Sequence, residues 1–148
     1  MKQISGIWFE VKARYEQLQE DGSNKKVCDT FAVKADNFAD AYHKACDYTS
    51  EELTSGEFKI IDEKVAPYNG VVRSDSINDD KYYRVKVVLV QLNEKTNKEK
   101  ATPVYLLIQA MNIEKARKYA EELYSSSMID FSIKQVIETK IIDLVYSE

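Results

Sequence analysis

Apolar and polar residues alternate near the start of the chain. One set of alternate positions is apolar: Phe9, Val11, Ala13 and Tyr15. The positions between them begin with an aromatic residue and continue with charged ones: Trp8, Glu10, Lys12 and Arg14. Because successive side chains of a strand point to opposite faces, this period of two predicts a strand with one buried face.

A turn and a second strand are expected next. Residues 20–24 contain the pair Asp21-Gly22, which suits the positive φ angles of a tight hairpin. The following strand places Phe31, Val33 and Ala35 on one side. The first half of the chain therefore begins with a β-hairpin.

A helix and a third strand complete the first half. Asp36 or Asn37 is expected to cap the helix N-terminus. Helical spacing predicts an apolar stripe made of Phe38, Ala41, Tyr42 and Ala45, continued by Tyr48 and Leu53. Gly56 ends the helix, and residues 58–65 have the composition of a strand.

The second half follows the same plan. Strands are predicted over residues 83–92 and 104–110, joined by a turn at 93–99. Asn112 caps a helix whose inward positions are Ile113, Ala116, Ala120 and Leu123. Serines 125–127 end this helix, and residues 131–145 supply strand in two pieces.

An internal repeat explains this similarity. At an offset of 74, "WFEVKARYEQL" lies over "YYRVKVVLVQL", and later segments align at offsets of 75 and 73. We therefore predict an α+β fold of two tandem duplicated ββαβ units, with six to eight mostly antiparallel strands, two helices and a pseudo-two-fold axis. The predicted ranges are 1–72 for the first repeat, 73–81 for a polar linker and 82–148 for the second repeat, in one compact domain.

Composition and charge narrow the possible functions. The 148 residues are 44% hydrophobic and 31% charged, as in an ordinary folded chain. The net charge is −4, with −3 in residues 1–74 (10 basic, 13 acidic) and −1 in residues 75–148 (11 basic, 12 acidic). Neither half has the strong positive charge of a duplex-DNA binder. The absence of an apolar segment long enough for a signal or a membrane span predicts a cytoplasmic protein without a membrane partner.

The sequence contains no enzyme motif. The two cysteines, Cys28 and Cys46, do not have the spacing of a zinc site and are expected to be reduced. The single histidine, His43, lies beside the apolar stripe of the first predicted helix. There is no glycine-rich phosphate loop and no nucleophile elbow. We therefore expect no catalytic residue, no bound cofactor and no metal ion.

Two surfaces on the predicted sheets are candidate binding sites. Aromatic and basic residues occupy the strand positions that point away from the helices: Trp8, Lys12, Arg14, Lys34, Tyr82, Arg84 and Lys86. Aromatic rings stack on unpaired bases while cations neutralise phosphates, so this face fits single-stranded nucleic acid. Apolar side chains on the same side of the second half form a candidate contact face: Val88, Val90, Tyr105 and Leu107.

Several segments resemble an uncharacterised family of small bacterial proteins, a domain of unknown function common in gut anaerobes and their bacteriophages. The similar segments are "WFEVKARYE" (8–16), "GSNKKV" (22–27), "KADNFADA" (34–41) and "SGEF" (55–58). The resemblance covers most of the first repeat and fades in the second. It implies no activity and no functional residue.

Three hypotheses for the function follow. The first is a small non-enzymatic binding module that acts through protein–protein contacts or self-association as a homodimer; the resemblance implies a phage-encoded accessory or host-modulating factor. The alternative is a single-stranded nucleic-acid-binding protein that uses the aromatic and basic face. The third is an enzyme with an unrecognised site.

Overall fold

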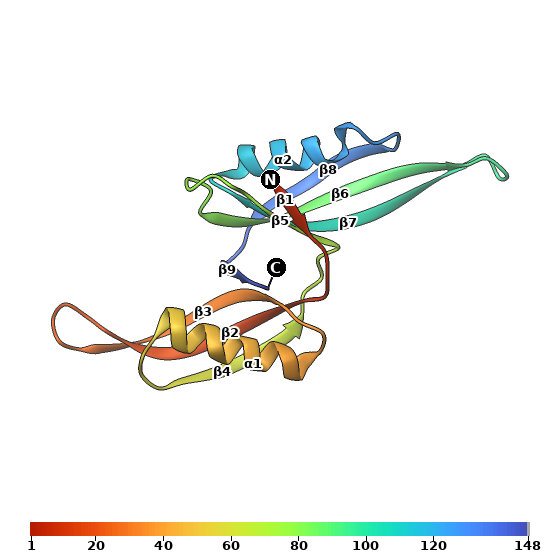
Figure 1. Ribbon diagram of the computed structural model, residues 1–148. Coiled ribbons are helices and arrows are strands. Elements are labelled where there is room, and N and C mark those ends of the chain that lie inside the picture. Colours follow the sequence, from red (N-terminus) through yellow and green to blue (C-terminus); the bar gives the residue numbers. More distant parts are fainter. Residues whose placement is uncertain (148) are drawn as a thin grey trace. The chain divides into compact units, whose positions relative to one another are not determined.

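The computed structural model describes residues 1–147 and shows two α-helices and nine strands in two mixed sheets (Figure 1). The chain divides into two compact units by its contacts. The 6–67 unit contains Gly6–Pro67 and the described residues from Lys140 onward, and the 68–139 unit contains Met1–Ser5 and Tyr68–Thr139. The fold is therefore α+β, as predicted, but residues 1–147 contain nine strands instead of the six to eight that were expected, because the short strands at residues 2–4 and 70–73 were not predicted.

The 6–67 unit has a four-stranded sheet in the order β4-β2-β3-β9. Its elements are β2 (Trp8–Leu18), β3 (Asn24–Lys34), α1 (Phe38–Tyr48), a π-helical turn (Thr49–Leu53), β4 (Phe58–Val65) and β9 (Ile141–Val145). Strand β9 runs parallel to β3, and the other neighbours are antiparallel.

The 68–139 unit has a five-stranded sheet in the order β1-β5-β7-β6-β8. Its elements are β1 (Lys2–Ile4), β5 (Gly70–Arg73), β6 (Lys81–Asn93), β7 (Lys98–Ala110), α2 (Ile113–Ser125) and β8 (Asp130–Glu138). Strand β5 runs parallel to β7, and the remaining pairs are antiparallel.

Neither unit is one continuous segment of chain. Strand β9 directly follows β8 in the sequence but pairs with β3 of the 6–67 unit. Strands β1 and β5 flank the 6–67 unit in the sequence but belong to the sheet of the 68–139 unit. The prediction of mostly antiparallel strands is confirmed, since five of the seven pairings among residues 1–147 are antiparallel. The two parallel pairings could not be predicted, because the pairing of a short strand depends on contacts distant in the sequence.

Small residues bring each helix close to its sheet. Ala41 and Ala45 of α1 are buried in one core, and Ala116 and Ala120 of α2 are buried in the other. The predicted stripes were partly wrong, because Phe38, Tyr42 and Ile113 are exposed. Their other large members, Tyr48, Leu53 and Leu123, pack against the cores as expected. The short alanine side chains at the centre of each contact let the helix backbone lie close to the sheet.

The helix caps and hairpin turns agree with the sequence. The Asn37 side chain accepts a hydrogen bond from the backbone N–H of Asp40 at 2.8 Å, and the Asn112 side chain accepts one from Lys115 at 2.8 Å. These bonds satisfy amides that the helix itself leaves unpaired. Gly22 has a φ of 86°, as expected for the first hairpin turn, and Asn97 has the corresponding positive φ of 56° in the second.

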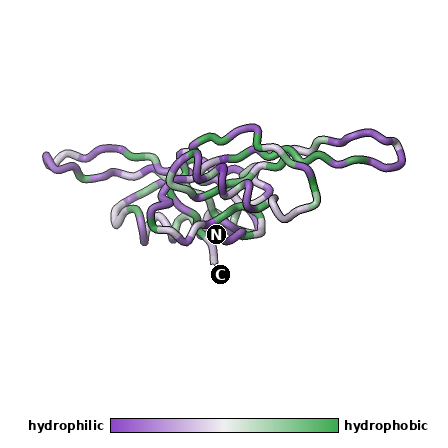
Figure 2. Tube along the Cα trace, turned by 90° about the horizontal axis from the view of Figure 1, so that it is seen from above, coloured by the Kyte–Doolittle hydropathy of each residue, from purple (hydrophilic) through white to green (hydrophobic). Residues whose placement is uncertain are grey.

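Each hairpin ends in a polar two-stranded tip. The β2–β3 and β6–β7 ribbons extend past the part of the sheet that the helix covers, and their tips are hydrophilic (Figure 2). On these tips the backbone has partners within the hairpin only. The tips therefore expose both of their ribbon faces.

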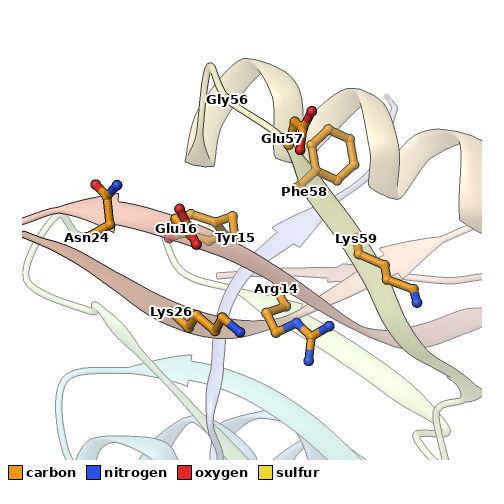
Figure 3. A pocket seen from close by; sticks show the side chains of 9 residues that line it. All are labelled: Arg14, Tyr15, Glu16, Asn24, Lys26, Gly56, Glu57, Phe58 and Lys59. Atoms are coloured by element: carbon orange, nitrogen blue, oxygen red, sulfur yellow. The ribbon is translucent and has the colours of Figure 1, made fainter.

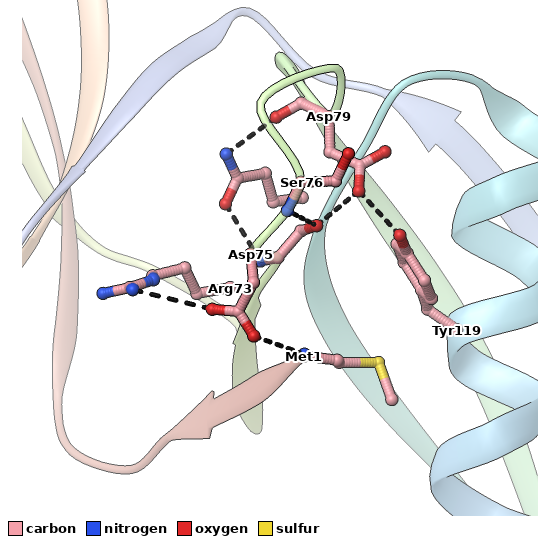
Figure 4. A network of polar contacts seen from close by, with 8 residues as sticks. Met1, Arg73, Asp75, Ser76, Asp79 and Tyr119 are labelled. Carbon is pink, nitrogen blue, oxygen red and sulfur yellow. Dashed lines mark hydrogen bonds and ion pairs between the residues drawn. The ribbon is translucent and has the colours of Figure 1, made fainter.

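The segment predicted to be a polar linker, residues 73–81, contains a buried carboxylate. Asp79 is 2% exposed. Its Oδ2 accepts a hydrogen bond from Ser74 Oγ and another from Tyr119 Oη at 2.6 Å (Figure 4). Gln109 joins both ends of the loop, because its amide donates to the Asp79 carbonyl at 2.8 Å and accepts from the Ser74 N–H at 3.0 Å. The loop is thus fastened to α2 and β7.

Candidate binding surfaces

Both sheets have one face covered by a helix and one face that points away from it. In β2, Phe9, Val11 and Ala13 belong to the core under α1, so the alternate residues point to the other face. In β6, Val85 and Val87 belong to the core under α2. All of the candidate binding residues lie on the faces that point away from the helices.

The two aromatic residues of the predicted stacking surface are buried. Trp8 is 2% exposed and Tyr82 is 6% exposed. The Trp8 ring contacts the Tyr146 ring edge-on, with their centroids 6.1 Å apart. Stacking on a base requires an accessible ring face, which neither side chain offers here. The sequence did not reveal this burial, because Trp8 and Tyr82 lie at strand positions that alternate with the apolar ones.

The basic residues of that surface differ in exposure. Lys12, Lys34, Arg84 and Lys86 are half-buried, whereas Arg14 is exposed. The Lys86 ammonium lies 6.0 Å from the centre of the Tyr105 ring, in reach of a cation–π contact. Arg14 is thus the most accessible cation among the predicted residues.

Arg14 lines a groove of about 530 Å³ in the 6–67 unit (Figure 3). The groove follows the neighbouring parts of β2, β3 and β4, and its lining residues are Arg14, Tyr15, Glu16, Asn24, Lys26, Gly56, Glu57, Phe58 and Lys59. We call Arg14, Lys26 and Lys59 the basic cluster. The sequence alone did not identify Lys26 and Lys59 as partners of Arg14.

Strand register brings the basic cluster together. Arg14 lies opposite Lys59 of β4 and opposite Cys28 of β3, and Lys26 is two residues from Cys28. The pairing of β2 with β4 shifts by one residue between Lys12 and Ala13. Such a bulge changes which residues share a face, and the sequence pattern did not reveal its position.

Tyr15 anchors the strand beneath the groove. Its hydroxyl donates a hydrogen bond to Asp29 Oδ2 at 2.5 Å. Burial, this hydrogen bond and the negative charge of Asp29 raise the pKa of Tyr15 to about 12. The neutral phenol is therefore the form that the fold stabilises.

This arrangement predicts the titration of Tyr15. The stabilisation from its raised pKa is fully present below the unfolded value of about 10 and is lost as the pH rises through about 12. Asp29→Asn should lower the pKa of Tyr15 without restoring the ordinary value, because burial remains. Carbon NMR of the tyrosine ring carbons, assigned with Tyr15→Phe, measures both values. An unchanged pKa in Asp29→Asn would show that the carboxylate has no influence.

The corresponding surface of the 68–139 unit is apolar. Val88 and Val90 are half-buried, and Leu92 is 58% exposed. Pro103 lies opposite Val88 and Ala101 lies opposite Val90, and both are exposed. We call these five residues the apolar strip. Among the other predicted contact residues, Tyr105 is half-buried and Leu107 is fully buried.

Pro103 also protects the ribbon against uncontrolled pairing. A proline has no N–H to donate, so it interrupts the free edge of β7. Strand β5 pairs with β7 only at residues 106–108, so the edge near Pro103 has no neighbouring strand. The apolar strip is thus offered as a side-chain surface rather than as an edge for strand addition.

Residues 1–147 contain neither a metal-ligand cluster nor a helix that could span a membrane. In that part of the chain, no three side chains of His, Cys, Asp or Glu are close enough together to hold a metal ion. Over the same residues, neither helix has the length and apolar run needed to cross a lipid bilayer.

The family of the chain is shown by sequence comparison. Residues 7–147 match the family described as Domain of unknown function (DUF4494). The chain therefore belongs to the DUF4494 family. The match includes both halves, so the resemblance seen mainly in the first half extends through the second. Comparison with curated proteins and with solved structures found no match.

Proposed function

We propose that the protein is a non-enzymatic binding module that makes protein–protein contacts through the apolar strip. The observation that carries this proposal is the position of Val88, Val90 and Leu92 on the ribbon face opposite to the one that packs against α2. Apolar surface of this kind is removed from water when a partner binds, which contributes roughly 25 cal/mol per Å². Lys86 lies two residues before Val88 on the same strand face, so a partner with an acidic residue beside its apolar contact is favoured.

The test combines a charged variant with a control on the same ribbon. Val88→Lys with Val90→Lys should abolish contacts made by the strip, because each ammonium would have to be desolvated. Gln91→Lys with Thr102→Lys adds the same charge on the opposite face of these strands and should leave the contacts intact. Sedimentation velocity measures self-association, and quantitative affinity purification from the native cell measures other partners. Equal behaviour of both variants and the unaltered chain would overturn the proposal.

We also propose that the two units arose by tandem duplication and share a pseudo-two-fold relation. Equivalent details support this. The register shift after Lys12 in β2 has a counterpart after Lys86 in β6, 74 residues later. The backbone N–H of Ala66 donates to the Trp8 carbonyl at 2.8 Å, and that of Thr139 donates to the Tyr82 carbonyl at 2.9 Å. Functional divergence of the two copies then accounts for one charged and one apolar ribbon.

A further inference from the structure

The basic cluster places three cations within reach of one small ligand. Lys59, Arg14 and Lys26 come from three adjacent strands. Because neighbouring strands are about 4.8 Å apart, the cluster spans about 10 Å across the sheet. In Figure 3, the Lys26 side chain runs toward Arg14, and the head groups of Arg14 and Lys59 lie on the same side of the strands. Their long side chains can converge on a single anion.

Glu16 lies directly opposite Lys26 on the neighbouring strand, but within residues 1–147 no ion pair joins a carboxylate to any of the three cations. The ion pairs among residues 1–147 include Lys64 with Glu10 at 3.4 Å on the same sheet, but none involves Arg14, Lys26 or Lys59. Glu16 and Glu57 line the groove, and in Figure 3 Glu57 points away from the Arg14 head group. These two carboxylates bound the positive region, which favours a compact anion over a long polyanion.

The fold does not need charge at these positions. In the 68–139 unit, Val88 occupies the second position after the register shift, as Arg14 does in the 6–67 unit. Its cross-strand neighbours are Ser132 and Pro103, neither of which is charged. The same strand geometry is therefore built there without cations, so the basic cluster calls for a role other than folding.

We propose that the basic cluster is a binding site for a phosphoryl dianion, such as a phosphomonoester. The planar guanidinium of Arg14 can donate two parallel hydrogen bonds to phosphate oxygens, and the Lys26 and Lys59 ammonium groups supply the remaining positive charge. Two aromatic residues line the groove. Tyr15 is buried and its hydroxyl is bonded to Asp29, and the half-buried Phe58 lies beside Glu57, away from the Arg14 head group (Figure 3). Recognition is thus centred on the phosphoryl group rather than on a stacked base. This site is separate from the apolar strip, and the two proposals fail or succeed independently.

Cys28 provides a direct reporter of occupancy. Its thiol is free and exposed, and it lies opposite Arg14. A bound anion should shield it from a neutral maleimide. In a Cys46→Ser background, the labelling rate of Cys28 should fall by the factor 1 + [L]/Kd. With a Kd on the order of 1 mM, about 10 mM inorganic phosphate slows labelling about tenfold.

Matched variants and salts make the test specific. Arg14→Gln and Lys59→Gln should each remove the protection, whereas Lys25→Gln should keep it, because Lys25 neighbours Lys26 in sequence but points to the opposite face. Sodium chloride at equal ionic strength should not protect Cys28. A phosphoserine peptide and a nucleoside 5′-monophosphate then distinguish the two natural sources of a phosphomonoester. Absence of protection by every phosphate compound, or equal protection in Arg14→Gln, would overturn the proposal.

Discussion

Deletion of the chain after Thr139 should unfold the 6–67 unit while leaving the 68–139 unit largely folded. The deletion removes β9, which pairs with Thr30, Ala32 and Val33 of β3. It also exposes the core where Val145 packs. The loss of the Ile141, Leu144 and Val145 side chains costs roughly 4 kcal/mol. That is a large part of the 5–15 kcal/mol typical of a whole domain.

Hydrogen exchange followed by mass spectrometry can measure the protection of backbone amides in each unit separately. Amides of β2, β3 and α1 should lose protection in the deletion variant, and amides of β6 and β7 should keep it. A shorter deletion that removes only the residues after Tyr146 retains β9 and is the control. Tyr48→Phe gives an intermediate case, since it keeps β9 and removes the hydrogen bond from Tyr48 Oη to Asp143 Oδ2 at 3.0 Å. Unchanged protection in β3 of the longer deletion would contradict this role of β9.

The order of the longer elements was predictable because it depends on local patterns, whereas the short strands β1 and β5 were not predicted. Alternation identified β2, and the prediction of a strand at residues 58–65 matches β4, Phe58–Val65. The helix caps at Asn37 and Asn112 were predictable for the same reason, since a cap is decided by a few consecutive residues. The parallel partners β9 and β5 were not, because a pairing between distant segments leaves no periodic signal.

The candidate surfaces were predictable only in part. The contrast between Arg14 and Val88 was visible in the sequence, since both follow the same alternating pattern. The membership of Lys59 depended on the register shift in β4, and the burial of Trp8 depended on packing. Side-chain periodicity therefore gives the face of a strand, whereas cross-strand neighbours require the register.

Asp79→Asn should destabilise the 68–139 unit by about 3 kcal/mol at neutral pH. The reason is that Asp79 Oδ2 accepts hydrogen bonds from Ser74 and Tyr119, and a hydrogen bond to a charged group contributes about 1.5–3 kcal/mol. An asparagine can place only an uncharged oxygen at the Oδ2 position, so both hydrogen bonds lose the strength that the carboxylate charge gives them. Asp80→Asn is the matched control, because Asp80 is the neighbouring carboxylate and is exposed.

The same variant should change the pH dependence of stability. Burial raises the pKa of Asp79, but the hydrogen bonds from Ser74, Tyr119 and the Met111 backbone, with the charge of Lys115, outweigh it and hold the pKa below 3.8. A lowered pKa in the folded state gives stability that is present above the unfolded value and is lost as the pH falls through the folded one. The difference in the free energy of unfolding between the unaltered chain and Asp79→Asn should therefore become smaller below about pH 4.

Urea denaturation at neutral and acidic pH, with hydrogen exchange in α2 as the local readout, measures this difference. Tyr119→Phe should lose less stability at neutral pH than Asp79→Asn, because it removes one of the two hydrogen bonds and leaves the carboxylate bound to Ser74. If Asp79→Asn and Asp80→Asn lose equal stability, the effect is one of general surface charge. A loss confined to Asp79→Asn at neutral pH instead assigns the stability of the loop between β5 and β6 to this one carboxylate.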